Sequence, residues 1–364
     1  MTALAREHAT APITDVRFRR SVMPKDDPTW RFALGARAES VGILLEMEDA
    51  DGIVGLGYAS EVPHLGYDID VMEAVVASRV RGVLAAPALD RRSVVGSPWR
   101  QTLPAPVRSL FDMAWHDRLA KIAGVPLYRL LGGAENVTLR VNRIVALKTP
   151  DEMAAVAVRL KGEGYDHFKI KVENRPMSLD IARVAAIREA VGDAAVMTVD
   201  ANQSYTAKEA VTFGRAIHGL GVQIFEQPVP RGDIAALRWV RDRSDLTIEA
   251  DESADSLEAI TALLRHDAVD AVSLKLSKLG GIDSLLLAAN LCAAQGVGTR
   301  IGAHVGSRIM NAAALHAAAA LPHIEPFAEL GEFARLTNDV ATGLEVLDGG
   351  ISVPTDPGLG ISLA

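Results

Sequence analysis

Residues 167–202 read HFKIKVENRPMSLDIARVAAIREAVGDAAVMTVDAN, and this stretch decides the fold. It begins with a short run, 167–172, in which apolar residues alternate with charged ones, and it ends with a second apolar run, 195–200. Between the two runs, residues 178–191 carry apolar side chains at helical spacing. The stretch therefore predicts a strand, a helix and a second strand, which is the repeating unit of parallel sheets.

The same unit recurs along the chain at near-even spacing, and each apolar run ends in a charged side chain. From Lys169 the steps are 31 residues to Asp200, 26 to Glu226, 25 to Asp251, 24 to Lys275, and 54 across two units to Glu329. Eight alternating strands and helices predict an α/β fold that closes into a TIM-like barrel, which gathers the strand ends on one face. The strand candidates are 139–145, 167–172, 195–200, 223–226, 247–250, 271–275, 299–303 and 325–330, and the helix candidates include 150–163, 178–191, 207–220 and 282–295.

The segments that flank this repeat have a different pattern. Apolar runs at 41–47 and 53–58 around Asp51-Gly52 predict a β-hairpin, and residues 70–84 and 106–122 have helical periodicity. Residues 1–12 have the composition of a loose polar leader. We therefore expect an N-terminal α+β domain at 1–132, a barrel at 133–340, and a C-terminal segment at 341–364 that packs back on the first domain.

Composition excludes several classes of protein. The chain has 364 residues, of which 49% are hydrophobic and 23% charged, as in ordinary globular enzymes. A net charge of -8 without a basic run argues against nucleic acid as a partner. Cys292 is the only cysteine, so no disulfide framework is expected. No signal peptide and no membrane span are predicted, and a cytoplasmic location is the expectation.

Three carboxylates at consecutive strand ends point to a metal. Asp200, Glu226 and Asp251 each follow an apolar strand and precede a polar or turn segment. Three unpaired carboxylates at one barrel mouth would repel each other, so a compensating cation is expected. Oxygen ligands alone suit a hard ion, and the sequence therefore predicts a Mg²⁺ site.

Lysines precede and follow these acids along the chain. Lys169 and Lys171 lie two residues apart, so a strand places both on the same face, and Lys275 ends the sixth strand, across the barrel from the second. We expect mutual repulsion to depress the pKa of at least one of the paired lysines, which would make it a workable general base.

With these motifs the chain resembles the muconate lactonising enzyme subgroup of the enolase superfamily. Beyond the KxK pair, the resemblance rests on five segments: 114–133 (AWHDRLAKIAGVPLYRLLGG), 200–202 (DAN), 226–228 (EQP), 251–253 (DES) and 275–281 (KLSKLGG). It implies a modified (β/α)7β barrel under an N-terminal capping domain that the C-terminal tail completes. It also implies Mg²⁺ on Asp200, Glu226 and Asp251, Lys171 and Lys275 as an opposed acid/base pair with Lys169 as electrostatic neighbour, and assembly as a dimer or octamer.

The chemistry implied is removal of the proton alpha to a substrate carboxylate through an enediolate, most simply racemisation or epimerisation of an amino-acid derivative. A cycloisomerase or a syn-dehydratase would use the same lysines, and a barrel retained as a non-catalytic binding protein is a distant alternative. A dehydrogenase suggested by Gly55-Leu56-Gly57 has little support, because the third glycine is missing and the pair lies in a hairpin.

Residues around the predicted mouth are candidates for substrate contact. Glu329 stands where dipeptide epimerases of the subgroup have an Asp-x-Asp pair, and the second acid is absent, which argues against a dipeptide substrate. His304 ends the seventh strand and is either a substrate contact or structural. The capping-domain loops at 26–35 and 60–67 are expected to set specificity. The candidate substrate-binding residues are Glu329, His304, Asn202, Trp30 and Tyr67.

Overall fold

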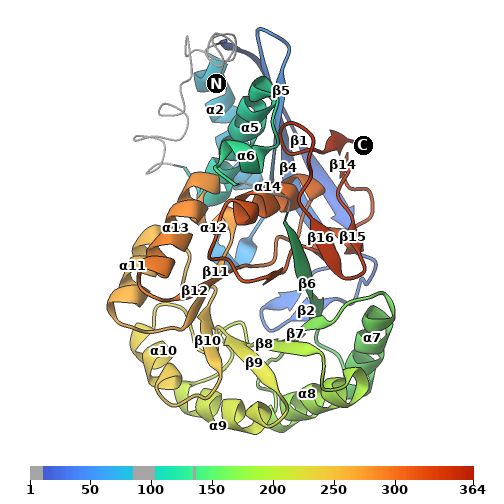
Figure 1. Cartoon of the computed structure of the whole chain (residues 1–364), viewed down its shortest axis with the longest axis vertical. Helices are drawn as coiled ribbons and strands as arrows, with labels where there is room; N and C mark the ends of the chain where they lie inside the picture. Colours follow the sequence, from blue (N-terminus) through green and yellow to red (C-terminus); the bar gives the residue numbers. More distant parts are fainter. Residues whose placement is uncertain (1–10, 85–102, 134–136) are drawn as a thin grey trace.

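The computed structural model describes residues 11–84, 103–133 and 137–364. Two domains lie one above the other, with the barrel at the bottom of Figure 1 and the N-terminal domain above it. Within the described residues, no helix is long and apolar enough to cross a membrane. The expected polar leader lies outside the described residues except for Ala11 and Pro12, whose carbonyls accept hydrogen bonds from Arg118 and Ala50.

The N-terminal domain is an antiparallel sheet covered by two helices. The sheet has the order β1-β4-β5, and β4 and β5 form the predicted hairpin. Gly55 and Gly57 allow close helix packing, because an added Cβ would lie 2.0 Å from the Ala114 carbonyl oxygen or 2.1 Å from that of Leu110. The elements are β1 (Ile13–Pro24), β4 (Glu39–Asp49), β5 (Val54–Ser60), α2 (Ile69–Leu84) and α5 (Ala105–Ala123), with the small hairpin β2 (Arg31–Phe32) and β3 (Gly35–Ala36), η1 (Pro63–Leu65), and α6 (Leu127–Leu130).

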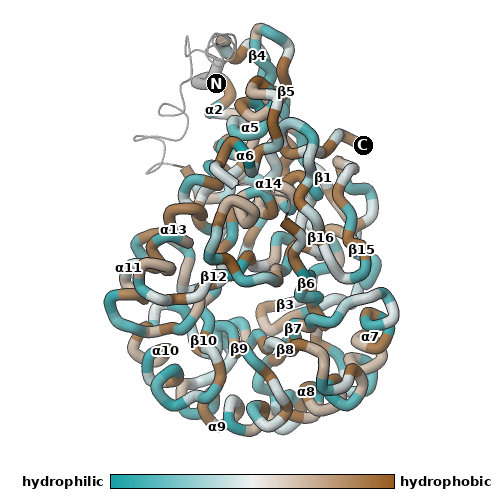
Figure 2. The backbone as a smooth tube through the Cα atoms, in the orientation of Figure 1, coloured by the Kyte–Doolittle hydropathy of each residue, from teal (hydrophilic) through white to brown (hydrophobic). Residues whose placement is uncertain are grey.

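The barrel is built from eight parallel strands, with helices outside. The strands β6 to β12 pair in sequence order, and β13 closes the ring by pairing with β6 and by a 3.0 Å hydrogen bond from Glu329 N to Ile301 O. Brown and teal stretches alternate along α8 and α9 in Figure 2, as expected for helices with one face on a barrel. The strands are β6 (Thr138–Val145), β7 (His167–Lys171), β8 (Val196–Asp200), β9 (Val222–Glu226), β10 (Thr247–Ala250), β11 (Ala271–Leu274), β12 (Gly298–Ile301) and β13 (Phe327–Ala328). The helices are α7 (Pro150–Gly162), α8 (Met177–Val191), α9 (Ala207–His218), α10 (Ile234–Arg241), α11 (Leu257–Arg265), α12 (Leu276–Leu279), α13 (Ile282–Ala294) and α14 (Arg308–Ala319), followed by η2 (Glu332–Arg335).

The C-terminal tail contacts both domains. It forms β14 (Ala341–Thr342), β15 (Val346–Leu347), β16 (Gly350–Ser352) and β17 (Ser362–Leu363), and β16 pairs antiparallel with the barrel strand β6. Beyond β16, Leu359 N donates a 2.7 Å hydrogen bond to Asp117 Oδ1 on α5. The tail therefore extends the barrel sheet before it reaches the N-terminal domain, whereas the sequence pattern predicted only the second contact.

Candidate active site

A cavity of about 150 Å³ lies between the C-terminal ends of the barrel strands and the N-terminal domain. From above, Trp30 and Phe32 of the β2–β3 hairpin pack against Ile144 and Ala146 of the barrel and cover the mouth. The predicted residues that line the cavity are Lys169, Lys171, Asn202, Asp251, Lys275, His304 and Trp30.

The two lysines of β7 point to the same side, as the strand period requires. Lys169 is 1% exposed, and its Nζ lies 3.1 Å from Asp200 Oδ2, 2.7 Å from Glu226 Oε2 and 2.9 Å from Glu329 Oε2. Lys171 Nζ lies 2.5 Å from Asp200 Oδ2 and 3.1 Å from Asn202 Oδ1. The two ammonium groups therefore share Asp200, which is fully buried.

Lys275 faces the cavity from the far side of the barrel. It is the extended residue between β11 and the short helix α12, and its Nζ lies 2.6 Å from Asp251 Oδ2. Gly302 leaves room for it, because a Cβ at that position would lie 2.6 Å from Lys275 Cε. Lys278 holds the same acid by a 2.6 Å hydrogen bond to the Asp251 carbonyl and an ion pair to its carboxylate.

Neighbouring acids set the pKa values of Lys169 and Lys275. Burial alone would lower the pKa of Lys169, but Asp200, Glu226 and Glu329 outweigh burial and raise it well above its ordinary value. Burial would likewise lower the pKa of Lys275, but Asp251 outweighs burial and the pKa is raised. Of the paired lysines, of which at least one was expected to have a depressed pKa, Lys169 has a raised pKa instead, because neighbouring carboxylates have a stronger effect than the second lysine.

The three predicted metal ligands are all buried at strand ends, but their carboxylates are held apart by basic side chains. Burial would raise the pKa of Asp200 and of Asp251, yet lysines outweigh it and hold both below the ordinary value. At Glu226 burial prevails, and the pKa is raised well above the ordinary value, with Asp200 and Glu329 adding to the effect of burial. Glu226 therefore sits where further positive charge would be stabilising.

His304 lines the cavity, but the backbone occupies both of its ring nitrogens. Nδ1 lies 2.7 Å from Gly302 O, and Nε2 accepts a 3.0 Å hydrogen bond from Leu276 N. Burial lowers the pKa of His304 to about 4, so the ring is neutral at neutral pH. His304 thus fixes the start of α12 directly after Lys275. Of the two roles considered for His304, substrate contact or structural, these contacts fit the structural one.

Two expected substrate contacts lie elsewhere. Glu329 is fully buried and is not among the residues lining the cavity, since it pairs with Lys169 and Arg300 and accepts a 3.0 Å hydrogen bond from Ala303 N. Arg300 and Lys169 outweigh burial and lower its pKa to about 2. Tyr67 packs against the apolar cluster of the N-terminal domain and does not line the cavity either.

Arg300, Glu249 and Gln227 belong to the site although sequence reasoning missed them. Arg300 is fully buried, with Nη2 2.9 Å from Glu226 Oε2 and Nε 3.2 Å from Glu249 Oε1. Gln227 Oε1 accepts 3.0 Å hydrogen bonds from Asp251 N and Ser253 N, so it joins the loops after β9 and β10. A charged residue inside an apolar strand, as in Thr299-Arg300-Ile301, was the available signal.

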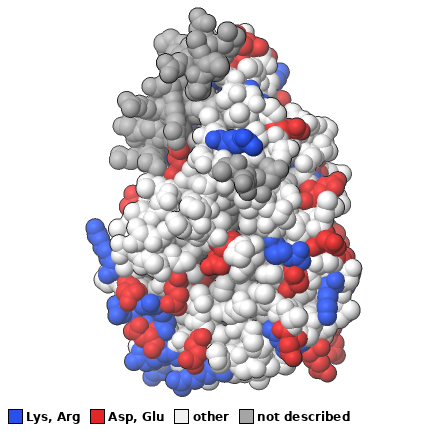
Figure 3. All heavy atoms as spheres, in the orientation of Figure 1, with Lys and Arg blue, Asp and Glu red and all other residues white. Residues whose placement is uncertain are grey.

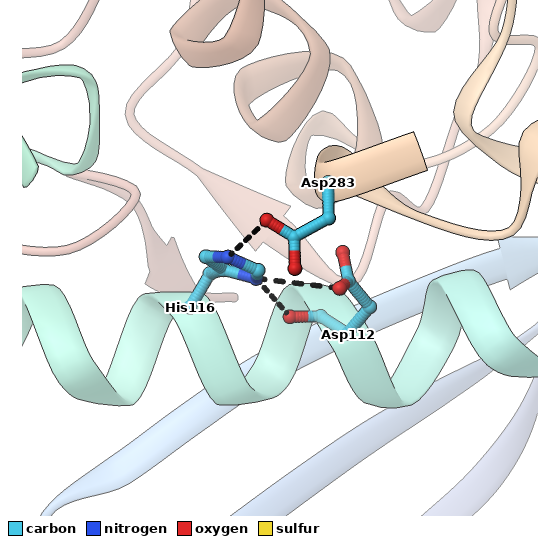
Figure 4. Close-up of side chains that lie close together, drawn as sticks. All are labelled: Asp112, His116 and Asp283. Carbon is cyan, nitrogen blue, oxygen red and sulfur yellow. Dashed lines mark hydrogen bonds and ion pairs between the residues drawn. The ribbon is translucent and has the colours of Figure 1, made fainter. Parts of the chain in front are cut away.

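A second charged cluster joins the two domains (Figure 4). His116 on α5 lies between Asp112 on the same helix and Asp283 on α13, with Nδ1 3.5 Å from Asp112 Oδ1 and Nε2 3.7 Å from Asp283 Oδ1. Among the described residues, these three can each place one ligand atom within 4.8 Å of the other two, which is close enough to chelate one ion. Burial opposes the effect of the two acids, which raise the pKa of His116 to about 10. The imidazolium therefore already supplies the positive charge, and Asp112 also accepts a 2.5 Å hydrogen bond from Ile282 N.

This cluster should make stability depend on pH in a defined window. Because the pKa of His116 is about 10 in the folded chain and about 6.5 when unfolded, its contribution is complete below about pH 6.5 and lost as pH rises towards 10. We expect the stability advantage of wild type over His116→Gln to fall by about 1.4 kcal/mol per pH unit between pH 7 and 9. Urea unfolding at several pH values measures this difference. The exposed His218→Gln is the control, and parallel curves for wild type and His116→Gln would show that His116 is neutral.

Comparison with known proteins agrees with this architecture. A family model described as mandelate racemase / muconate lactonizing enzyme, N-terminal domain, matches residues 13–132, and one described as enolase C-terminal domain-like matches residues 152–364. The L-Ala-D/L-Glu epimerase of Bacillus subtilis is 31% identical over 96% of both chains. A chloromuconate cycloisomerase of Pseudomonas putida is 31% identical over 86% of this chain and 87% of its own.

Solved structures agree as well. The dipeptide epimerase of Enterococcus faecalis V583, complexed with Mg and the dipeptide L-Leu-L-Tyr, superposes with a TM-score of 0.89 at 28% identity over 96% of this chain and 99% of its own. The resemblance inferred from the motifs is therefore confirmed, and with it the barrel and capping domain. The chain belongs to the mandelate racemase/muconate lactonizing enzyme family of the enolase superfamily, and it is an isomerase of that family.

Proposed function

We propose that the enzyme removes the proton alpha to the carboxylate of an amino-acid derivative and returns a proton on the opposite face. The observation that carries this proposal is the position of Lys171 and Lys275, which line one cavity from the second and the sixth of eight barrel strands. Two bases on opposite sides of one carbon are what a 1,1-proton transfer needs. The names of the epimerase relatives support the same reaction class.

The oxygen donors of the site suit Mg²⁺, and we assign Asp200, Glu226 and Asp251 as its ligands, although in their lysine-paired arrangement the three carboxylates do not lie close enough together to chelate one ion. Six carboxylates meet five basic side chains at this end of the barrel, and the pKa of Glu226 is raised by burial first and by Asp200 and Glu329 second, so a bound cation would favour its charged form. The donors are oxygens from three neighbouring strands, which suits a hard cation. When bound, Mg²⁺ would take over these carboxylates from the lysines and stabilise negative charge on the substrate carboxylate. The acids are Asp200, Glu226, Glu249, Asp251, Glu252 and Glu329, and the bases are Lys169, Lys171, Lys275, Lys278 and Arg300.

We assign proton transfer, charge stabilisation and exclusion of water to different residues of the cavity. Lys171 and Lys275 move the proton, one on each face of the alpha carbon. Lys169 is held by Asp200, Glu226 and Glu329, and its ammonium group stabilises the enediolate where negative charge develops. Trp30 and Phe32 exclude water, which strengthens each of these electrostatic interactions.

A cycloisomerase is the second candidate, because the relatives include chloromuconate cycloisomerases of comparable identity. In that reaction, as in a dehydration, one lysine acts and the other need not. The lysine variants discussed below separate these cases.

Proton NMR in D₂O tests the proposed reaction directly. With Mg²⁺ present, we expect the alpha-proton signal of the true substrate to wash out while the opposite stereoisomer forms, because each lysine exchanges its protons with solvent. The panel comprises N-acyl amino acids, dipeptides, proline betaines and hydroxyprolines. Excess EDTA should stop the exchange, and restored Mg²⁺ should recover it. If no panel member exchanges although Mg²⁺ binding is confirmed by calorimetry, the proposal of racemisation fails for these classes.

A further inference from the structure

One carboxylate at the cavity remains without a partner. Glu61 follows β5, lines the cavity from the capping domain and is half-buried. Among the described residues its carboxylate takes part in no hydrogen bond or ion pair, whereas Asp251 is held by lysines and Glu252 accepts from Asn202. Glu61 therefore differs from the other acids that line the cavity.

The backbone around Glu61 is fixed. Glu61 N donates a 2.9 Å hydrogen bond to Val41 O, and the neighbouring Ser60 hydroxyl donates one of 2.9 Å to Val305 O in the loop after β12. Ser40 donates to the same carbonyl at 2.9 Å. The carboxylate thus stands on a segment tied both to the sheet of its own domain and to the barrel, so it is preorganised for a ligand.

Lys25, in the cavity next to the first one, is directed to other partners. A second cavity of about 120 Å³ adjoins the first and shares Glu61, Trp30, Phe32 and Val305 with it. Its Lys25 donates to Arg37 O at 2.9 Å and lies 3.7 Å from the centre of the Trp30 ring. Burial lowers the pKa of Lys25 to about 8, against the opposing effect of Glu332. Lys25 therefore does not occupy the Glu61 carboxylate.

The two ends of the cavity therefore carry different charged side chains. On the barrel side the lining includes Lys169, Lys171 and Lys275 beside the acids Asp251 and Glu252, while the capping side offers Glu61 among apolar side chains. Under the proposed function the substrate carboxylate lies at the barrel end, and Glu61 favours a cation at the other end. A neutral group there would leave a desolvated carboxylate without a partner, which costs binding free energy.

We propose that Glu61 binds a cationic group at the distal end of the substrate. The ligand class is an alpha-carboxylate with a free amine several bonds away, of which an unblocked dipeptide is the simplest example. This inference rests on the proposed function, since it takes the carboxylate to lie at the lysines. The eighth strand lacks the second acid that dipeptide epimerases use for the substrate ammonium. A dipeptide remains a suitable substrate, because the capping domain would supply the acid for the ammonium in place of Glu329.

Pairs of unblocked dipeptides and their N-acetyl derivatives test this assignment with Mg²⁺ present. Wild type should prefer the unblocked member by about 10-fold or more in kcat/KM, since a charged hydrogen bond is lost on acetylation. Glu61→Gln should remove most of this preference through KM and leave kcat for the acetylated member close to wild type. Glu61→Lys should reverse the preference. The matched control is Glu39→Gln, which lines only the second cavity and should keep the wild-type ratio.

Calorimetric affinities for the same pairs separate this inference from the proposed reaction. If binding shows the ammonium preference and Glu61→Gln loses it, Glu61 is confirmed even when no alpha-proton exchanges, and only the reaction is then wrong. If exchange occurs with equal preference in wild type and Glu61→Gln, the reaction stands and the role of Glu61 is refuted. Failure of both members of every pair to bind also refutes it.

Discussion

Interconversion of stereoisomers should fall by about 10²- to 10⁴-fold when either Lys171 or Lys275 is replaced by alanine, because each supplies one positioned acid or base. Both side chains line the cavity, and each is held by a different acid, Asp200 for Lys171 and Asp251 for Lys275. Each variant therefore lacks the acid/base residue on one face of the alpha carbon and keeps the residue on the other face. Polarimetry or chiral chromatography on the substrate found by NMR measures the loss.

Isotope exchange distinguishes the two lysines. A variant that keeps one base can still exchange the alpha proton of the stereoisomer that presents it to that base, so each variant should retain D₂O exchange on one stereoisomer only. Lys208→Ala on α9 is the control for loss of an exposed lysine. Circular dichroism should show an unchanged fold. Near wild-type interconversion by either variant would remove that lysine from the mechanism, and a need for only one of them would favour cycloisomerisation or dehydration.

The sequence predicted the strand ends well because each is marked locally. An apolar run that stops at Asp200, Glu226 or Asp251 shows both where the strand ends and which side chain follows it. The period of two likewise places Lys169 and Lys171 on one face without any knowledge of the rest of the fold. The candidate acids and lysines were therefore within reach of sequence reasoning.

Partner choice was not predictable in the same way. At least one of the paired lysines was expected to have a depressed pKa because only their mutual proximity is visible in the sequence, whereas the acids that raise the pKa of Lys169 lie 31 to 160 residues away. Glu329 and Tyr67 follow the same logic, since packing of whole domains decides whether a side chain reaches the cavity. The distribution of surface charge does not reveal the site either, because acidic and basic side chains are interspersed on the face shown in Figure 3.

Loss of Arg300 should destabilise the fold strongly. Its guanidinium pairs with Glu226, Glu249 and Glu329, and all four side chains are fully buried. Removal of one partner from such a buried cluster costs about 3–5 kcal/mol, because the remaining charges stay desolvated. We therefore expect Arg300→Met, which keeps most of the volume, to lower the free energy of unfolding by that amount in urea titrations at pH 8.

Arg231→Met is the matched control, since Arg231 pairs with Asp255 at 3.5 Å with both side chains more than 40% exposed, and its loss should cost less than about 1 kcal/mol. Adding Glu249→Gln to Arg300→Met should recover part of the loss, because Glu249 has no second basic partner among the described residues, whereas Lys169 still pairs with Glu226 and Glu329. The cost should also shrink at pH 5, since carboxylates left without a cation have raised pKa values and take up protons there. A loss below about 1 kcal/mol at pH 8 would mean that the cluster already holds its acids protonated, and Arg300 would then serve the geometry of Glu226 and not the stability of the barrel.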